Sequence, residues 1–401
     1  MTMTINNEHK KLNVPNLRFP EFQGEWEKMR LDAFTERVMR KNKSNQSRLP
    51  LTISAQYGLV DQITFFNKVV ASTDLSNYYL LKKGEFAYNK SYSSDYPWGA
   101  IKRLDNYDQG ALSSLYICFA PQDNVVSDFI LQYFESPKWH KGISEIAVEG
   151  ARNHGLLNVA VQDFFHTYHY VPNDKKEQIK ISKLLMLLDE RISTQNKIIE
   201  DLKKLKSAII EIEYTPNTKT TSPIGDVIEQ ISKRNKNNAI QNVLSVSNRQ
   251  GFIKQSDQFE NRNVASEDTS NYKIVEQNDF AFNPARINVG SIARLTTFEK
   301  GIVSPMYICF RTQENVAPEY IDYFFESKHF YCEIQKRLEG SVRQCLSFEG
   351  LCNIPLSLPS FEMQQLIGKR LFTLGQKVKT ETYLLELLNK QKQYLLRQMF
   401  I

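Results

Sequence analysis

The sequence has 401 residues, of which 41% are hydrophobic, and this length excludes a small scaffold with one core and indicates two or three domains. Its 24 Phe and 19 Tyr residues can fill real cores, so a disordered or collagen-like chain is excluded as well. The formal net charge of +6 permits a polyanionic partner but does not require one.

The first segment, residues 1–16, is polar and lacks the apolar core of a secretory signal, so we expect a flexible tail there. The sequence contains no run of about 18 apolar residues, and a membrane-spanning helix is therefore not expected. These two features predict a cytoplasmic protein.

From residue 17 onward, the same order of motifs occurs twice. The hexapeptide GAIKRL at 99–104 returns as GSIARL at 290–295, and YICF at 116–119 returns at 307–310, both at an offset of 191 residues. A period of this length indicates duplication of a whole domain. Because strand-like runs and helical patterns are mixed in both copies, we expect two homologous α+β domains. Their predicted bounds are 17–173 and 224–359.

Each copy ends in a proline followed by a long stretch with helical periodicity, which predicts long helices at 174–213 and 360–401. A polar segment rich in Pro and Thr, at 214–223, is the predicted linker between the copies. Apolar residues recur every 3.5 positions in both stretches, as in a coiled coil. The predicted seam consists of Ile181, Leu185, Leu188, Ile192, Ile199, Leu202, Ile209, Ile367, Leu371, Leu374, Val378, Leu385, Leu388 and Leu395.

A helix of about 30 residues is about 45 Å long and needs a partner of similar length to cover its apolar stripe. We expect the two helices to pair as an antiparallel coiled coil, with pseudo-two-fold symmetry between the two halves. The alternative is that each helix packs on its own domain. Polar residues at matching seam positions, Gln195 and Lys206 in one helix and Glu381 and Lys392 in the other, are expected to help set the register.

The sequence contains no assembled catalytic motif. It lacks the G-x-x-x-x-G-K-[ST] loop of ATP-driven enzymes. Residues 283–286, NPAR, begin like the Asn-Pro-Pro-aromatic turn of adenine methyltransferases but differ from it at Ala285 and Arg286. Asp174-Lys175-Lys176 is read as a solvated helix start, and His166 and His169 have no third metal ligand nearby. We therefore predict a binding or scaffold protein with no catalytic residue, metal or cofactor of its own.

Basic residues keep their place in both copies, as RKNK at 40–43 and KRNK at 233–236. Lys and Arg in such loops can neutralise phosphates, and Asn, Gln and Arg can read base edges; for either cluster alone, a solvated loop is the alternative. Polar residues in turn-like segments that differ between the copies are further candidates. Arginines that recur in both copies, at 103 and 294 and at 152 and 343, are predicted to position phosphates or to form internal ion pairs.

The candidate DNA-binding residues are Arg40, Lys41, Asn42, Lys43, Gln56, Tyr57, Lys90, Arg103, Arg152, Lys233, Arg234, Asn235, Lys236, Asn248, Arg249, Arg286, Arg294 and Arg343.

The motif LRFPEFxGEW at 17–26 precedes two domains that each close with a Pro, a Gln-containing turn and a long helix. In this plan the chain, from about residue 17 to 399, resembles the DNA-specificity subunit of type I restriction-modification systems. The resemblance implies a non-catalytic subunit whose two domains each read one half of a bipartite DNA target. It implies that the helices set the spacing between the half-sites and dock two modification subunits.

In the same family, the modification subunits bring S-adenosylmethionine and methylate adenine, and restriction subunits add translocation and cleavage that need ATP and Mg. The resemblance implies these cofactors for the partners and none for this chain. Two other classes stay open at the level of sequence. They are a self-contained restriction or methylation enzyme and a coiled-coil adaptor without DNA specificity.

Overall fold

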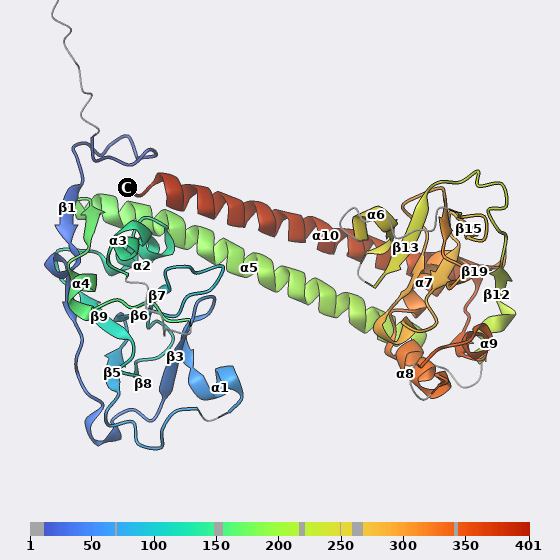
Figure 1. The fold of residues 1–401 in the computed structure, drawn as a ribbon, viewed down its shortest axis with the longest axis horizontal. Helices are drawn as coiled ribbons and strands as arrows, with labels where there is room; N and C mark the ends of the chain where they lie inside the picture. The colour runs from blue at the N-terminus through green and yellow to red at the C-terminus, as the bar shows by residue number, and fades with distance from the viewer. Residues whose placement is uncertain are drawn as a thin grey trace, which may run out of the picture. The chain divides into compact units, whose positions relative to one another are not determined.

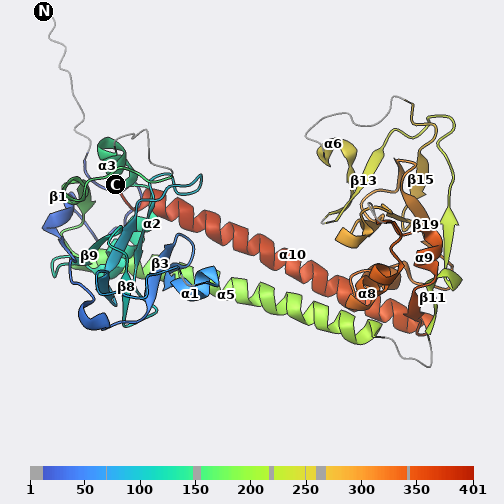
Figure 2. The same ribbon diagram turned by 60° about the horizontal axis from the view of Figure 1, so that its bottom comes forward.

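The computed structural model describes residues 12–68, 70–147, 155–215, 221–248, 250–258, 268–340 and 344–401, and Figures 1 and 2 show its elements. The chain forms two units, one of residues 1–195 with 384–401 and the other of residues 196–383. Residues 1–11 of the predicted tail and 216–220 of the predicted linker lie outside the described residues. Each long helix contributes to both units, and the domain bounds predicted from sequence stay predictions.

In its described part, the first unit contains two four-stranded sheets and one pair of strands. The first sheet has the order β2 (Thr35–Arg37), β9 (Ile117–Pro121), β6 (Phe86–Asn89) and β7 (Ala100–Arg103). The second sheet has the order β4 (Gly58–Asp61), β3 (Pro50–Ser54), β8 (Gln109–Leu112) and β5 (Tyr79–Lys82). The pair joins β1 (Glu27–Arg30) to β10 (Tyr168–Val171).

The short helices of this unit are α1 (Gln62–Phe66), α2 (Ser127–Glu135), α3 (His140–Ile146) and α4 (Val161–Phe165), with 3-10 turns at Leu31–Ala33 and Lys43–Asn45. A hydrophobic core rich in aromatic residues joins Phe86 and Phe119 of the first sheet to Phe129 of α2 and to Ile181 of the long helix α5 (Lys175–Tyr214). Helix α2 therefore packs between this sheet and the first turns of α5 (Figure 1). The second sheet has a smaller core of its own.

The second unit repeats this plan. One described sheet has the order β12 (Ile228–Ile231), β19 (Ile308–Thr312), β16 (Phe280–Phe282) and β17 (Ile292–Arg294), and the other β14 (Gly251–Lys254), β13 (Val243–Ser247), β18 (Lys300–Val303) and β15 (Lys273–Glu276). The strand pair is β11 (Thr221–Pro223) with β20 (Pro355–Ser357). The short helices are α6 (Gln255–Gln258), α7 (Pro318–Phe324), α8 (Lys328–Arg337) and α9 (Phe348–Cys352), with 3-10 turns at Ile224–Asp226 and Ile287–Val289.

The two units share their strand orders and pairing directions. In both, the second sheet contains one parallel pair, β3 with β8 and β13 with β18, among antiparallel neighbours. This agreement confirms the prediction of two homologous α+β domains. Residues 221–223, at the end of the predicted linker, form strand β11 and pair with β20.

Two long helices complete the fold, α5 (Lys175–Tyr214) and α10 (Phe361–Gln398). In the first unit, the beginning of α5 and the end of α10 pack in one core, and Lys392 Nζ lies 2.5 Å from Asp189 Oδ1. In the second unit, Ile210 near the end of α5 shares a core with Ile367 near the beginning of α10. In each unit the start of one helix thus packs with the end of the other, which is the predicted antiparallel direction.

The predicted seam residues are all buried or half-buried. Those that are buried are Ile181, Leu185, Leu188, Ile199, Ile367, Leu371 and Leu388, and those that are half-buried are Ile192, Leu202, Ile209, Leu374, Val378, Leu385 and Leu395. The alternative, in which each helix packs on its own domain, describes only the first turns of each helix. The pseudo-two-fold relation between the units stays a prediction.

Candidate nucleic-acid interface

Each basic loop is tied by its backbone to the chain segment just before a neighbouring strand. In the first unit, the N–H of Asn42 donates to the carbonyl oxygen of Tyr78 at 3.0 Å. In the second unit, the N–H of Asn235 donates to the carbonyl oxygen of Tyr272, also at 3.0 Å. The two loops therefore have the same anchor, as the offset of 193 residues between them predicts.

The asparagines in the middle of these loops are buried, with exposed fractions of 0% for Asn42 and 2% for Asn235. Asn42 Oδ1 accepts from the N–H of Ser47 at 2.8 Å, and Asn42 Nδ2 donates to the Ser47 carbonyl at 2.8 Å. Asn235 makes the matching bonds with Ile240, at 3.1 and 2.9 Å. The geometry does not support the predicted DNA contact for these two residues, because their amides hold the loops together.

The cations of the two loops differ in their side-chain hydrogen bonds and ion pairs. Arg40 Nη2 lies 2.5 Å from Glu85 Oε1, and Lys41 Nζ donates to the carbonyl oxygen of Asn77 at 2.7 Å. Arg234 Nη1 donates to an Asn271 side chain. Three loop cations, Lys43, Lys233 and Lys236, have exposed side chains that make no hydrogen bond or ion pair within the described part of the chain. A hydrogen bond from Lys300 lowers the pKa of Glu276, and the charge of Lys233 contributes to this shift. The three loop lysines keep their charge available for phosphates.

The recurring arginines Arg103 and Arg294 form ion pairs inside their domains. Arg103 Nη1 lies 2.7 Å from Asp128 Oδ1 on α2, and Arg294 Nε lies 3.2 Å from Asp322 Oδ2 on α7. Both arginine side chains are about one-tenth exposed, at 11% and 9%. Burial raises the pKa of Asp322, and the neighbouring guanidinium opposes this shift. Of the two predicted roles, this geometry favours the internal ion pair.

Three further candidates, Arg152, Arg249 and Arg343, lie outside the described residues. The remaining candidates sit on two neighbouring loops in each unit. In the first unit these are the β3–β4 turn with Gln56 and Tyr57, and the loop after β6 with Lys90. In the second they are the β13–β14 turn with Asn248, and the loop after β16 with Arg286.

The two loops of each pair meet in space. The hydroxyl of Tyr96 donates to the carbonyl oxygen of Ala55 at 3.4 Å, which joins the loop after β6 to the β3–β4 turn. In the second unit, the Ser291 hydroxyl donates to the Val246 carbonyl at 3.3 Å and joins the loop after β16 to the end of β13, just before the β13–β14 turn. Segments about 40 residues apart in the sequence thus form one polar surface in each unit.

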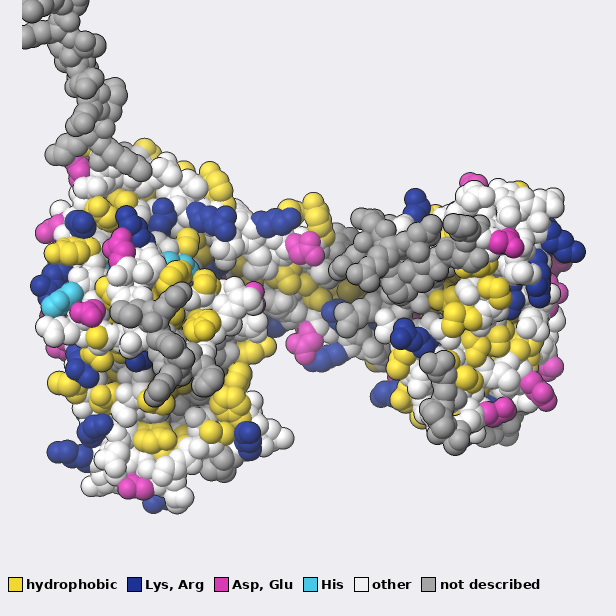
Figure 3. Space-filling model, in the orientation of Figure 1, with side chains coloured by type: hydrophobic (Ala, Val, Ile, Leu, Met, Phe, Trp, Pro, Cys, Tyr) yellow, Lys and Arg dark blue, Asp and Glu magenta, His cyan; other side chains and the backbone are white. Residues whose placement is uncertain are grey.

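The basic loop and the polar surface lie at opposite ends of one strand. In the first unit, residues 40–43 precede β3 and the turn at 55–57 follows it, and β13 separates the matching segments of the second unit. A five-residue strand is about 16 Å long. Figure 3 shows Lys and Arg side chains dispersed over the visible face of each unit, together with hydrophobic surface over α1 in the first.

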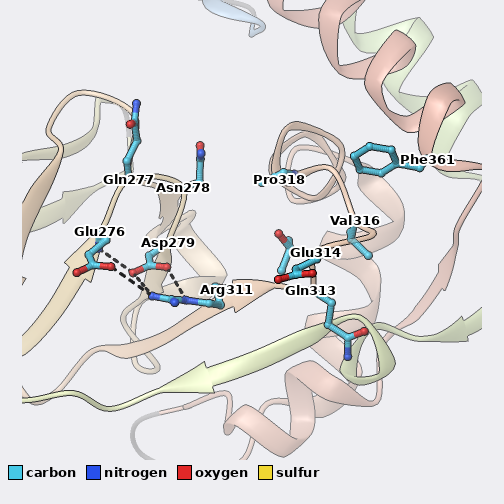
Figure 4. Close-up of a pocket in the computed structure, with 11 residues that line it drawn as sticks. Glu276, Gln277, Asn278, Asp279, Arg311, Gln313, Glu314, Val316, Pro318 and Phe361 are labelled. Atoms are coloured by element: carbon cyan, nitrogen blue, oxygen red, sulfur yellow. Dashed lines mark hydrogen bonds and ion pairs between the residues drawn. The ribbon is translucent and has the colours of Figure 1, made fainter.

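A hollow of about 310 Å³ in the second unit has the wrong charge for phosphate. Carboxylates of Glu276, Asp279 and Glu314 line it, with Phe361 at one side (Figure 4). Its cation, Arg311, lies 3.0 Å from Asp279 Oδ1 and is neutralised by it. Burial raises the pKa of Asp279, against the effect of Arg311. Because acids outnumber the cation, we leave this hollow out of the candidate interface.

Two buried glutamines are structural residues that the candidate list did not contain. Gln178 Oε1 accepts from the N–H of Val126 at 2.7 Å, and Gln364 Oε1 accepts from the N–H of Ala317 at 3.0 Å. Val126 and Ala317 are the N-cap residues of α2 and α7, so each glutamine ties the long helix to the first α-helix after β9 or β19. The signal was present in the Gln-containing turns at the start of both long helices.

Within the described residues, no group of three or more His, Cys, Asp or Glu side chains is placed to hold a metal ion. The described helices include none with the length and apolar character needed to cross a membrane. His169 is buried between Tyr133 and Thr167, with ring nitrogens 2.9 and 2.7 Å from their hydroxyls, and burial lowers its pKa to about 3. These contacts hold His169 in strand β10, in the interior of the first unit.

Comparison with known proteins places this geometry in context. Residues 216–390 match a family model described as the type I restriction modification DNA specificity domain. The fold is similar to that of a type I restriction-modification S subunit from M. genitalium, with a TM-score of 0.57 and 15% identity over 97% of this chain and 99% of that one. A comparison with curated proteins gives no match.

Two further solved structures are similar. One, from work on complex assembly and conformational transition of the type I R-M system, has a TM-score of 0.53 and 14% identity over 94% of this chain and 97% of that one. The HsdS subunit from Thermoanaerobacter tengcongensis has 14% identity over 94% and 96%, with a TM-score of 0.46. At these identities, the first two similarities establish a shared fold.

Proposed function

Since this chain carries a domain of the type I restriction modification DNA specificity family at residues 216–390, we propose that it is the subunit that selects the DNA sequence in such a system. Each unit reads one half of a bipartite target in double-stranded DNA. The family match agrees with the resemblance seen in the sequence. A subunit for DNA specificity needs no catalytic residue, and this supports the prediction of a non-catalytic chain.

One observation carries the proposal beyond the family. Two domains of the same fold present polar loops at the same place, and the residues on those loops differ: Gln56 and Tyr57 in one unit, Asn248 and Gln250 in the other. A common scaffold with different polar loops suits two readers of different half-sites. A plain adaptor protein needs no polar loops of this kind at matching places in its two domains.

The geometry suggests how each unit divides its contacts with DNA. Lys43 in the first unit and Lys236 in the second are exposed at one end of β3 and β13, and the polar loops lie at the other end. The strand length of about 16 Å is comparable to a major groove about 12 Å wide. The lysines then contact phosphate while the polar loops reach into the groove. Phosphate contacts position the domain, and base contacts specify the sequence.

The long helices set the distance between the half-sites in this proposal. They also dock two modification subunits that bind S-adenosylmethionine, and restriction subunits that use ATP and Mg complete the complex in the cytoplasm. Large apolar side chains stand exposed on both helices, and they are available to such partners. The most exposed of them are Leu187, Ile212, Phe372, Tyr383 and Tyr394. Exposed apolar surface of this kind typically marks a protein interface.

The test is methylome sequencing of a host that expresses this chain together with its modification subunit. The control host expresses the modification subunit alone. We expect a new bipartite N6-methyladenine motif only when this chain is present. Co-purification of the two proteins without any new motif would contradict DNA selection and favour the coiled-coil adaptor. Methylation by the purified chain alone would instead favour a self-contained enzyme.

A further inference from the structure

Tyr57 is a large aromatic residue held in solvent by a rigid turn. It lies at the tip of the β3–β4 hairpin and is 68% exposed. Its N–H donates to the Ser54 hydroxyl oxygen at 3.1 Å, and the next residue, Gly58, has a φ of +79° that suits glycine. The backbone of the turn is therefore fixed while the ring is left uncovered.

Tyr92 is the second such residue, on the loop after β6, and it is 48% exposed. Its N–H donates to the Gly155 carbonyl at 3.0 Å, and two residues earlier the Lys90 carbonyl accepts from the N–H of Leu157 at 2.9 Å. These bonds attach the loop to a separate segment of the chain. Little ordering entropy remains to be lost when Tyr92 makes a contact.

The two loops form one surface, because the Tyr96 hydroxyl donates to the carbonyl of Ala55 beside the turn. Both rings thus belong to the polar surface of the first unit. Tyr88, on the strand that leads into the second loop, is fully buried, whereas Tyr57 and Tyr92 are exposed. The further exposed aromatic residues of this unit lie outside these two loops and are Phe65, Phe66, Tyr168 and Tyr394. Uncovered aromatic rings on anchored loops are typical of contact residues.

The second unit has no aromatic residue at the matching turn position. Gln250 stands where Tyr57 stands in the first unit, at the offset of 193 residues, next to exposed Asn248. On the second loop, Arg286 is exposed. Amides and guanidinium groups read purine edges by paired hydrogen bonds. The second unit is therefore equipped for polar readout, and the first has apolar rings in the same place.

We infer that Tyr57 and Tyr92 recognise thymine in the half-site read by the first unit, through contact of their rings with the 5-methyl group. This inference rests on the proposed function. The thymine methyl is the apolar feature that the major groove offers to a side chain. An aromatic ring provides a large apolar face for it, and the hydroxyl group can stay in water.

The test uses the complex of this chain with its modification subunit and a duplex that carries the methylated motif. Each thymine of the first half-site is replaced in turn by deoxyuridine, which lacks only the methyl group. Binding is measured for the wild type and for Tyr57→Ala and Tyr92→Ala. Loss of one buried methyl group is expected to weaken wild-type binding roughly four-fold. In the variant that lacks the contacting ring, the same replacement should have no effect.

Matched controls separate the ring from other causes. Tyr57→Phe and Tyr92→Phe keep the ring and should keep the dependence on thymine. Gln250→Ala in the second unit should weaken binding but leave the deoxyuridine effects in the first half-site unchanged. Both tyrosine side chains are exposed, so their variants should melt at the wild-type temperature.

Three outcomes would overturn the inference: deoxyuridine effects that persist unchanged in both alanine variants, wild-type binding that is indifferent to deoxyuridine, or a first half-site without thymine. In each of these cases the wild-type complex still binds its motif specifically. If the wild-type complex shows no specific binding at all, the proposed function itself fails. The two failures are therefore distinguished by the wild-type duplex alone.

Discussion

Replacing Phe400 by Ala should destabilise the first unit, although Phe400 lies at the opposite end of the sequence from most of that unit. The ring is 1% exposed and belongs to the core of the first unit. Its centroid lies 5.5 Å from that of Phe129, 5.7 Å from that of Tyr133 and 6.4 Å from that of Trp26. The ring thus packs in an aromatic cluster with Trp26, which precedes β1, and with two residues of α2.

The expected cost is about 3–5 kcal/mol, the usual range for Phe→Ala in a packed core. It combines the lost transfer free energy of the ring with the cavity that three aromatic neighbours cannot collapse to fill. In α2, which supplies two of these neighbours, local opening should become about 100-fold or more frequent, because every 1.4 kcal/mol changes an equilibrium constant tenfold.

Amide hydrogen exchange read by mass spectrometry measures this opening in peptides from α2, and from α7 of the second unit as an internal reference. Tyr394→Ala is the matched control, because Tyr394 is an aromatic residue near the end of α10, shortly before Phe400, and is 59% exposed. It should change stability by less than about 0.5 kcal/mol. Exchange in α2 within three-fold of wild type in the Phe400 variant would refute the reasoning.

Three more predictions concern the loops, the buried histidine and the helices. Asn42→Ala should lower the free energy of unfolding in urea by about 1–3 kcal/mol, because it leaves buried backbone groups unpaired. Lys43→Ala should leave that free energy unchanged and reduce the salt slope of DNA binding by up to about 0.9. A stability loss in the Lys43 variant with a reduced salt slope in the Asn42 variant would contradict these roles. The pKa of His169 is about 3 in the folded chain and 6.5 in the unfolded chain. The contribution of neutral His169 to the free energy of unfolding is therefore complete above pH 6.5. It is lost as the pH falls towards 3, by up to about 1.4 kcal/mol per pH unit. Unfolding of His169→Gln between pH 4 and 7 should lack this slope, and an unchanged slope would assign it to other groups. Matched heptads inserted after Leu202 in α5 and in the facing part of α10 add about 10 Å and should lengthen the tolerated gap in the methylated motif by roughly three base pairs; an unchanged gap would contradict the spacing role.

Several properties of this protein follow from the sequence alone because they depend on local or periodic signals. The repeat at an offset of 191 residues predicted two copies of one fold, and the strand orders of the two units agree. The 3.5-residue period of apolar side chains predicted both long helices, since such a stripe is stable only when it is covered. The resemblance to the DNA-specificity subunit of type I restriction-modification systems also followed from motifs, and residues 216–390 match a model of that specificity domain.

The roles of single polar residues depended on the tertiary structure. Asn42 and Lys43 are neighbours in one basic motif, yet the first is buried and bonded to Ser47 while the second is exposed. No periodic signal separates them, because burial in a loop depends on which distant segment packs against it. The sequence of Arg103 and its neighbours is compatible with a phosphate contact and with an internal ion pair. The structure favours the ion pair, because α2 places Asp128 Oδ1 2.7 Å from Arg103 Nη1.

Contacts between distant parts of the chain could not be predicted from the sequence either. Phe400 packs against Trp26, and Tyr96 joins its loop to the turn beside Tyr57. The heptad pattern shows that a helix has an apolar stripe, but it does not show which core receives the end of that helix. The sequence by itself determined the repeated plan and its long helices, whereas three-dimensional packing decided which side chains stabilise the domains and which remain exposed.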